Sequence, residues 1–399
     1  MSLDRNVPSG TGAAPRLPES PHQPARIAGT RAVLVCEGGH GFSRGAVATV
    51  RALAAAGYRP TVTVSAARSL AASSRHCARR VRVPSTLQDP AGFAAAVWRE
   101  AESRPYAAIL PANDDALTAL DWPVCQLLDK SAWTPVAASL GIAVPSTRLF
   151  EDADALQAAS AELEYPVVVK PDTKRYPARR VDSASALARI PGDGRIVVQP
   201  YVHDAMRGML GLLWHGRLIA AVHFSYLRIW PIPCGTASAA LTTTPDADLE
   251  ERLPALLEGY EGIFHLDLAG PYLLDVNPRV HATVALAVAA GVNLPDLYCD
   301  LVAGRDVATA RGRPGVFFRW LEGDIRSVLH AVRRGALPLG GGMAALWPRR
   351  GEVHGFESLG DPGPLLERAG YALRRSLGRR RPGTEGRPTA AGGQPRFTD

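Results

Sequence analysis

Apolar runs and glycine-rich turns alternate regularly over the first third of the chain. The runs are of two kinds, short ones rich in β-branched residues and longer ones with helical periodicity. Their alternation predicts a small α/β domain over residues 30–125. Strands are expected at 31–36, 61–64, 81–83 and 107–110, and helices at 45–56 and 90–102.

The pattern from residue 126 to residue 305 differs, because strands here also follow one another directly. One strand, 165–171, contains three consecutive valines and ends in Lys170 between prolines. A lysine at the end of an apolar strand is costly to bury unless an anion lies near it. Helices are expected at 130–139, 151–163, 183–188 and 282–290, and further strands at 195–199, 263–268 and 272–276.

The two ends of the chain carry weaker patterns. Residues 1–29 are rich in proline and small residues and predict a disordered leader. Residues 306–377 form a small C-terminal extension, and residues 378–399 read as a disordered basic tail. Within the extension we expect a strand at 315–320, a helix at 325–334 and a flexible break at 340–342.

The net charge of +7 raises the question of nucleic-acid binding. From Arg311 onward there are 16 basic against 8 acidic residues, which leaves 29 against 30 in the rest of the chain. The excess therefore belongs to the extension and tail, where no aromatic residues interleave with it. We expect no nucleic-acid partner.

Hydrophobic residues make up 46% of the chain and charged residues 21%, which is typical of a globular protein. The longest apolar run, 282–292, is too short to span a bilayer, and no signal-peptide pattern opens the chain. We expect a cytoplasmic protein without a membrane partner. The five cysteines form no CxxC pair, so neither a disulfide framework nor a zinc site is indicated.

The first predicted strand is followed by a glycine-rich turn that raises the possibility of a dinucleotide site. Gly39, Gly41 and Gly45 are spaced one residue too widely for the fingerprint, and no acidic residue ends the second strand. A tight turn in a Rossmann-like domain without cofactor is therefore favoured.

Magnesium chemistry is indicated by the segment 272–279, Tyr-Leu-Leu-Asp-Val-Asn-Pro-Arg. On a strand, Asp275 and Asn277 share one face, where a carboxylate and an amide oxygen can hold one hard cation. Arg279 follows directly, and its planar guanidinium can bind a phosphate or a carboxylate. The alternative, an edge strand that ends in a turn, has about even odds on these residues alone.

Lysine is rare in this chain, since only three of the 45 basic residues are lysines. They are Lys130, Lys170 and Lys174, all within one segment. Where arginine serves most positions, the remaining lysines are candidates for sites that need a compact ammonium group.

Five motifs in order resemble the ATP-grasp superfamily of carboxylate-amine ligases, over residues 30–305. They are Asp-Lys before a helix at 129–130, Gly-Ile-x-x-Pro-x-Thr at 141–147, Pro-Val-Val-Val-Lys-Pro at 166–171, Val-Val-Gln-Pro-Tyr-Val at 197–202, and Leu-Leu-Asp-Val-Asn-Pro-Arg at 273–279. The resemblance implies a Rossmann-like domain followed by a two-lobed ATP-grasp domain, so α/β followed by α+β.

The resemblance also implies roles for individual residues. Lys170 and Lys130 match the residues that hold the phosphates of ATP, and Asp275 and Asn277 match ligands of Mg²⁺. Asp267, on the preceding strand, is a further candidate ligand, and Arg279 matches the arginine that binds the transferred phosphoryl group. The adenine and ribose are assigned to Gln199, Pro200, Tyr201, Val202 and, more loosely, Asp204.

The loop after Lys170 departs from the family pattern, because it lacks the glycines that let a loop cover the phosphates closely. Lys174 and Arg175 are expected to supply positive charge instead. For the substrate, Arg228 is the candidate for a carboxylate, although a surface arginine on a loop fits as well. Trp230 is a candidate wall of the substrate pocket, and His281 is the histidine to test.

Together these features predict an enzyme that uses ATP and Mg²⁺ to join a small carboxylate to an amine. The competing hypothesis is a degenerate grasp protein that binds nucleotide without turnover, and the atypical loop favours it. A dinucleotide oxidoreductase is a third interpretation, which the Gly39–Gly45 turn does not support. The sequence names neither substrate and leaves the oligomeric state open.

Overall fold

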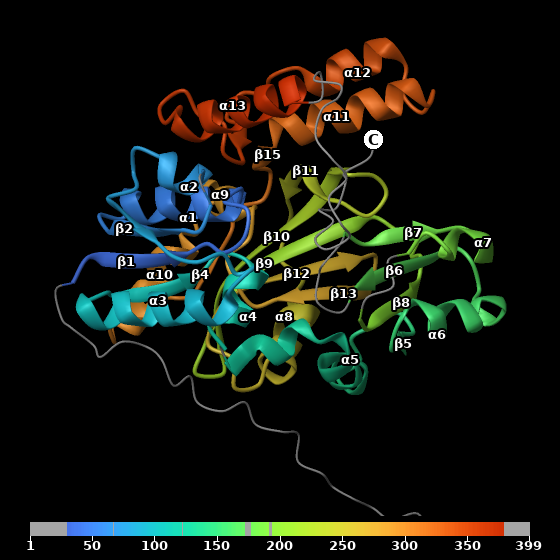
Figure 1. The fold of residues 1–399 in the computed structure, drawn as a ribbon, viewed down its shortest axis with the longest axis horizontal. Coiled ribbons are helices and arrows are strands. Elements are labelled where there is room, and N and C mark those ends of the chain that lie inside the picture. The colour runs from blue at the N-terminus through green and yellow to red at the C-terminus, as the bar shows by residue number, and fades with distance from the viewer. Residues whose placement is uncertain (1–29, 67, 122, 172–176, 191–193, 379–399) are drawn as a thin grey trace, which may run out of the picture.

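Three β-sheets organise the chain, which is seen in Figure 1 as a computed structural model. The described residues are 30–66, 68–121, 123–171, 177–190 and 194–378. The predicted leader falls outside them. No helix within these ranges has the length and apolar character needed to cross a membrane.

The first domain is a parallel four-stranded sheet with helices, as the alternating pattern predicts. Its elements are β1 (Ala32–Cys36), α1 (Arg44–Ala55), β2 (Arg59–Val64), α2 (Leu70–Ser73), β3 (Arg79–Arg82), α3 (Pro90–Ser103), β4 (Ala108–Pro111) and α4 (Asp114–Ala119). The strand order is β3-β2-β1-β4. Helix α1 begins after Ser43, whose side chain accepts a hydrogen bond from the N–H of Ala46, as expected of an N-cap serine.

A short helical connection and a small antiparallel lobe follow. The elements are η1 (Pro123–Leu128), α5 (Lys130–Ser139), β5 (Arg148–Phe150), α6 (Ala153–Ala158), η2 (Ser160–Glu162), β6 (Val167–Pro171), β7 (Arg179–Val181), α7 (Ala184–Leu187) and β8 (Ile196–Pro200). The helix predicted at 151–163 is divided into α6 and η2. In the sheet order β5-β8-β6-β7, Val168 on β6 faces Gln199 on β8.

The largest sheet has eight strands and forms the other lobe. Its elements are β9 (Met206–Trp214), β10 (Arg217–Trp230), β11 (Thr236–Thr242), α8 (Ala247–Leu256), β12 (Gly262–Ala269), β13 (Tyr272–Asn277), α9 (Val284–Ala289), α10 (Leu294–Val302), β14 (Ala310–Arg311), β15 (Phe317–Arg319) and β16 (Val353–His354). The order is β13-β12-β9-β10-β11-β15-β16, with β14 paired to β10. The segment around Arg228, predicted to be a loop, is the end of β10.

The C-terminal extension is more helical than the sequence pattern predicts. It contains α11 (Leu321–Arg333), α12 (Leu339–Leu346) and α13 (Gly363–Gly378). The flexible break predicted at 340–342 is wrong, because these glycines belong to α12. Gly342 is buried against α11, and a Cβ there would lie 2.8 Å from Val332 Cγ2. The glycine therefore allows close helix packing. The last helix includes Arg374, and the chain beyond Gly378 is outside the described residues.

Buried side chains show how the parts are joined. One core extends from β1 and α1 through β9 and β10 to α9 and α10, and a second joins β4, α3 and α5 to β12 and β13. The first domain and the large sheet therefore share cores. The small lobe has a separate core of its own, built from residues 150–198.

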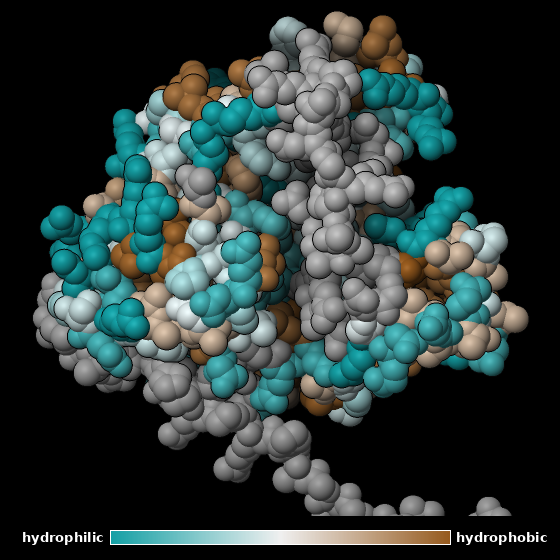
Figure 2. All heavy atoms as spheres, in the orientation of Figure 1, coloured by the Kyte–Doolittle hydropathy of each residue, from teal (hydrophilic) through white to brown (hydrophobic). Residues whose placement is uncertain are grey.

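Apolar side chains also remain on the surface of the extension. Hydrophobic atoms gather over α12 and α13 at the top of Figure 2. Leu339, Met343 and Leu366 are 70%, 67% and 68% exposed. The outer faces of these helices thus expose large apolar side chains.

Candidate active site

Two residues far apart in the sequence meet where α5 approaches the β12–β13 hairpin. Lys130, the first residue of α5, is 5% exposed, and its Nζ donates to Asp275 Oδ1 on β13 at 2.5 Å. The ammonium group also lies 5.9 Å from the ring centroid of Trp133. The structure therefore places a predicted phosphate-binding lysine directly beside a predicted metal ligand.

Lys170, at the end of β6, approaches the same hairpin from the small lobe. Its Nζ donates to Gln199 Oε1 at 3.0 Å, and Gln199 Nε2 donates to Thr147 Oγ1 at 2.9 Å. Burial lowers the pKa of Lys170 to about 8, and Lys130 lowers it further, whereas Asp275 and Asp267 oppose the shift. Charges act on one another in this way only over short distances. The end of β6 in the small lobe therefore lies close to Lys130 and the β12–β13 hairpin.

The hairpin presents its three candidate metal ligands on one face. Asp267 on β12 pairs across the hairpin with Asp275, and Asn277 follows two residues later on β13. Asn277 Nδ2 lies 3.3 Å from Asp267 Oδ2. In the described ranges no three or more His, Cys, Asp or Glu side chains gather in a metal-binding group. Two carboxylates and one amide oxygen nevertheless fit Mg²⁺, which keeps several waters and shares its remaining positions with phosphates.

Arg279 is tied to the first domain by a residue that the sequence analysis missed. Its Nε and Nη2 donate to the two carboxylate oxygens of Asp114, at 2.6 and 2.9 Å. Burial would lower the pKa of Arg279, but Asp114 outweighs it and leaves the pKa above the ordinary value. Nη2 also lies 3.3 Å from Asn277 Oδ1, so Arg279 competes with a cation for that oxygen. The acidic pair Asp114-Asp115 directly after a buried strand was the available signal.

Three further side chains line the base of the hairpin. The rings of His265 and His281 stack with centroids 3.7 Å apart. Tyr226 on β10 donates to Asp267 Oδ1 at 2.6 Å, and burial raises its pKa well above the ordinary value. Tyr226 therefore remains a neutral donor that orients a candidate metal ligand. Of these residues only His281 was singled out from the sequence. His265, on the same strand as Asp267, could have been found from strand alternation.

The residues assigned to the adenine lie where the small lobe joins the large sheet. Gln199 is buried, Pro200 is exposed, and the N–H of Tyr201 donates to Pro166 O at 2.9 Å. The guanidinium of Arg180 lies 4.4 Å from the Tyr201 ring centroid. Val202, the next residue, is half-buried at the same junction.

Asp204 and Lys174 are the other two residues predicted to bind the nucleotide. Asp204 is exposed and lies against the β12–β13 turn, where a Cβ on Gly270 would be 1.9 Å from its Oδ2. Its carboxylate therefore lies at the surface beside that turn. Lys174 and most of the loop after Lys170 lie outside the described residues.

Arg228 has an internal carboxylate partner. Its Nε and Nη2 donate to Asp324 Oδ1 and Oδ2 of α11, at 2.6 and 2.9 Å, and the Asp324 side chain is fully buried. Arg319 Nε lies 3.6 Å from the same carboxylate. The contact fixes the extension to β10, and a substrate role for Arg228 stays a prediction. Trp230 packs edge-on against His330, with centroids 6.3 Å apart.

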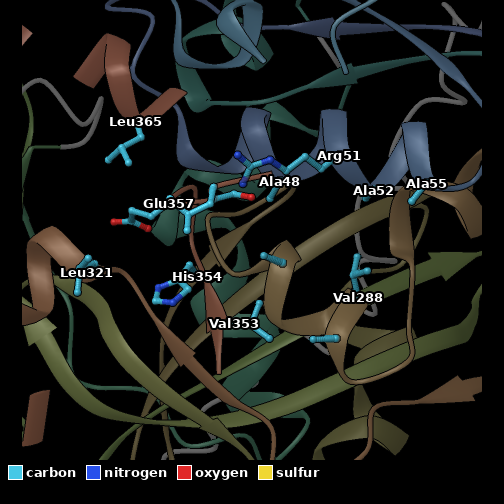
Figure 3. A pocket seen from close by; sticks show the side chains of 14 residues that line it. Ala48, Arg51, Ala52, Ala55, Val288, Leu321, Val353, His354, Glu357 and Leu365 are labelled. Atoms are coloured by element: carbon cyan, nitrogen blue, oxygen red, sulfur yellow. The ribbon is translucent and has the colours of Figure 1, made fainter. Parts of the chain in front are cut away.

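A sizeable cavity lies elsewhere in the structure. It has a volume of about 810 Å³ and lies between α1, α9 and the segment 353–365 (Figure 3). Its walls are mostly small or apolar, with Ala48 and Ala52 on one side and Val288 on the other. No residue predicted to bind ATP, metal or substrate lines it. The cavity is therefore separate from the cleft at the hairpin.

Comparisons with known proteins identify the fold. No family model matches the chain, and no curated protein matches its sequence. Among solved structures, it is similar to L-amino acid ligase from Bacillus licheniformis, with 16% identity, 68% of this chain and 74% of that chain covered, and a TM-score of 0.51.

Two further structures cover more of both chains. An ADP complex of N5-carboxyaminoimidazole ribonucleotide synthetase has 15% identity, coverage of 78% of this chain and 87% of that chain, and a TM-score of 0.55. The corresponding synthase from Aspergillus clavatus has 14% identity, coverage of 72% and 81%, and a TM-score of 0.56. These likenesses confirm the predicted architecture: the chain has an ATP-grasp fold preceded by a Rossmann-like domain.

Proposed function

We propose that this protein is an ATP- and Mg²⁺-dependent ligase that joins a small carboxylate to an amine. The observation that carries the proposal is the convergence of Lys130 and Lys170, from two different elements, on the hairpin with Asp267, Asp275 and Asn277. Two ammonium groups facing a carboxylate pair form a site for a triphosphate and a divalent cation.

Each group has a role in this reaction. Lys130 and Lys170 neutralise phosphate oxygens of ATP, and Arg279 stabilises charge on the transferred phosphoryl group. Asp267, Asp275 and Asn277 would hold Mg²⁺, which would neutralise phosphate charge when bound. Tyr226 donates to Asp267 Oδ1, and Asn277 Nδ2 contacts Oδ2, so these two residues orient the Asp267 carboxylate.

The bonds change in two steps. A substrate carboxylate oxygen attacks the γ-phosphorus, the bond to the bridging oxygen breaks, and ADP leaves as an acyl phosphate forms. The amine nitrogen then attacks the acyl carbon, and phosphate leaves with the bonding electrons and takes up the proton lost by the nitrogen. Closure of the small lobe over the cleft would exclude water from the acyl phosphate.

Phosphate release tests the proposal. Purified protein is incubated with ATP, Mg²⁺ and a pool of the twenty standard amino acids, and each variant is compared with the same mixture without the pool. We expect pool-dependent phosphate release that falls by about 10²-fold or more in Asn277→Ala and Lys170→Met. The exposed Asp154→Asn, on α6, serves as control. Phosphate release that is the same with and without the pool, and the same in Asn277→Ala as in the wild type, would rule out the ligase.

A nucleotide-binding protein without turnover is the second candidate. It is favoured by the internal pairs, because Lys130 is held by Asp275 and Arg279 by Asp114 in this structure. Such a protein would bind ATP, and Lys170→Met would weaken that binding, yet no amino-acid pool would stimulate phosphate release. The same set of measurements therefore separates the two functions.

A further inference from the structure

An uncharged segment of the C-terminal extension lies between two pairs of arginines. Residues 335–348 contain no charged residue, Arg333 and Arg334 precede them, and Arg349 and Arg350 follow them. All four arginines are exposed, and α12 occupies the middle of the segment. The segment therefore combines an apolar centre with positive charge at both ends.

The large apolar side chains of this segment point outward. Leu339 and Met343 are four residues apart and share one face of α12, and Trp347, directly after the helix, continues the same spacing. Trp347 is 74% exposed. Within the described residues, the large apolar side chains that are at least 61% exposed all belong to the extension: Leu339, Met343, Trp347, Leu359, Leu366 and Leu373. Exposed apolar groups of this kind mark interaction surfaces.

The outer face of α12 lies away from the candidate active site. Helices α11, α12 and α13 gather at the top of Figure 1, and the β12–β13 hairpin and the small lobe lie below them. The inner side of α12 packs on α11, where Gly342 allows close approach to Val332. Figure 2 shows hydrophobic atoms over the outer side of the same region. A partner on this face would therefore leave the candidate active site uncovered.

The acidic residues of the extension do not neutralise these arginines. Ion pairs with other arginines are formed by Glu322, Asp324, Glu352, Asp361 and Glu367. In the described part of the chain, Arg333, Arg334 and Arg350 form no ion pair with a carboxylate. The Arg349 guanidinium lies 4.2 Å from the Phe317 ring centroid. The apolar face is therefore bordered by positive charge that an anionic partner can neutralise.

We propose that α12 and the two arginine pairs dock the protein on a membrane surface that contains anionic lipids. Leu339, Met343 and Trp347 enter the boundary between headgroups and acyl chains, and the arginines contact lipid phosphates. Tryptophan and arginine suit this depth, because each combines an apolar body with a polar end. The proposal goes beyond the ligase function and does not depend on it.

Surface docking needs less chain than membrane spanning. A helix that spans a bilayer needs about 20 apolar residues, whereas a helix that lies in the surface needs only an apolar face. Helix α12 has eight residues and such a face. The proposal thus differs from the sequence-based expectation of no membrane partner, because that expectation considers spanning segments only.

Other partners fit these features less well. A two-fold contact between two copies through α12 would bring the arginine pairs of both copies together, and like charges repel. A nucleic acid would satisfy the arginines but would leave Leu339 and Met343 against phosphates or water. An anionic bilayer has an apolar layer beneath a layer of negative charge, so it matches both features.

Vesicle flotation tests the proposal with the full chain. Purified protein is mixed with vesicles of phosphatidylcholine, or of an equal mixture of phosphatidylcholine and phosphatidylglycerol, and the bound fraction is measured. We expect binding to the anionic vesicles to be at least about tenfold tighter than to the neutral ones. The double variants Leu339→Ser/Met343→Ser and Arg333→Gln/Arg334→Gln should each weaken it by about tenfold or more.

Matched variants separate docking from folding and from general charge. Leu87→Ser removes an exposed leucine of the first domain, and Arg99→Gln/Arg217→Gln removes two exposed arginines from other elements. All substituted side chains are exposed, so the melting temperatures should stay close to that of the wild type. The basic residues beyond Gly378 also attract anionic lipid. The apolar variant is therefore decisive, and equal binding of Leu339→Ser/Met343→Ser and wild type would overturn the proposal.

Trp347 reports directly whether the face enters the bilayer. Lipids brominated on their acyl chains quench a tryptophan that they contact, and Trp347→Phe isolates this residue among the seven tryptophans. We expect quenching in the wild type that is lost in Trp347→Phe. Vesicle binding without this quenching, or no binding of the folded wild type to anionic vesicles, contradicts the proposal.

Light scattering and duplex DNA cover the other partners. A dimer that Leu339→Ser/Met343→Ser dissociates, without vesicle binding by the wild type, would assign the face to a second copy. Binding to duplex DNA in place of vesicles, lost in Arg333→Gln/Arg334→Gln but kept in the apolar variant, would assign the arginines to a nucleic acid. Either result overturns docking on a membrane and leaves the ligase function untouched.

Discussion

Lys130 Nζ and Asp275 Oδ1 are 2.5 Å apart although 145 residues separate them in sequence. Lys130 is almost fully buried, and the side chain of Asp275 is 20% exposed. The pair connects α5, the helix before the small lobe, to β13 at the edge of the large sheet. It therefore joins these two elements and neutralises the Asp275 carboxylate until another cation replaces the lysine.

Breaking this pair should destabilise the protein. Lys130→Met leaves the Asp275 carboxylate without its partner, and Asp275→Asn leaves a buried ammonium, so we expect each to cost about 1–3 kcal/mol. The double variant should cost less than the sum of the two. Urea denaturation of the four proteins measures the coupling. Strictly additive losses would contradict an energetic link between the residues.

Nucleotide affinity should depend on pH through Lys170. Its pKa of about 8 means that the ammonium is lost as the pH rises through that value. Affinity for ATP is therefore expected to fall by about tenfold from pH 7 to pH 9. Arginine stays protonated over this range, so Lys170→Arg should bind ATP with a flatter pH profile. Fluorescent-nucleotide titration at several pH values measures both.

The same pKa shift predicts a change in stability without nucleotide. Between pH 8 and the ordinary lysine pKa of 10.5, the unfolded chain binds a proton that folded Lys170 does not. The free energy of unfolding therefore rises with pH over this window. Below pH 8 the full cost of burying the charged ammonium of Lys170 destabilises the folded protein. In Lys170→Met this contribution should be absent, which denaturation at pH 7.5 and 10 would show.

Strand and helix periodicity predicted the four strands of the first domain, strands β6 and β8, and the hairpin with Asp275 and Asn277, but not β9, β10 and β11 at the centre of the large sheet. Local patterns do not show which distant side chains meet, so Asp114 and Tyr226 were missed as partners of Arg279 and Asp267. The break predicted at 340–342 failed for a related reason. Gly342 is needed for contact with α11, and tertiary packing there overrides the low helix propensity of glycine.

Arg228 illustrates why a candidate carboxylate-binding residue is hard to assign from sequence. An arginine near the cleft fits a substrate carboxylate or an internal one equally well, and here Asp324 occupies the guanidinium. Only the fold brings α11 onto β10.

Removing the charge of Arg228 should therefore affect stability more than substrate binding. Arg228→Gln leaves the fully buried Asp324 carboxylate with Arg319 at 3.6 Å and a long hydrogen bond from Ser238, and we expect a loss of about 2–4 kcal/mol. Arg217→Gln, an exposed position on the same strand, is the control and should be nearly neutral. If Arg228→Gln is as stable as the wild type but has a strongly raised KM, Arg228 binds the substrate.

Asp114 should fix the orientation of the Arg279 guanidinium. Both carboxylate oxygens hold the guanidinium, and the side chains are 17% and 14% exposed. Asp114→Asn keeps the shape but removes the charge, so we expect a loss of about 2–3 kcal/mol and a lower kcat, since Arg279 loses its fixed orientation. Asp154→Asn is a matched control, because Asp154 also lies in the first turn of a six-residue helix but is exposed. Thermal unfolding and phosphate release of both variants test this expectation. If the two substitutions had equal effects, Asp114 would act only as a negative charge at the start of its helix. The orientation of Arg279 would then not depend on the first domain.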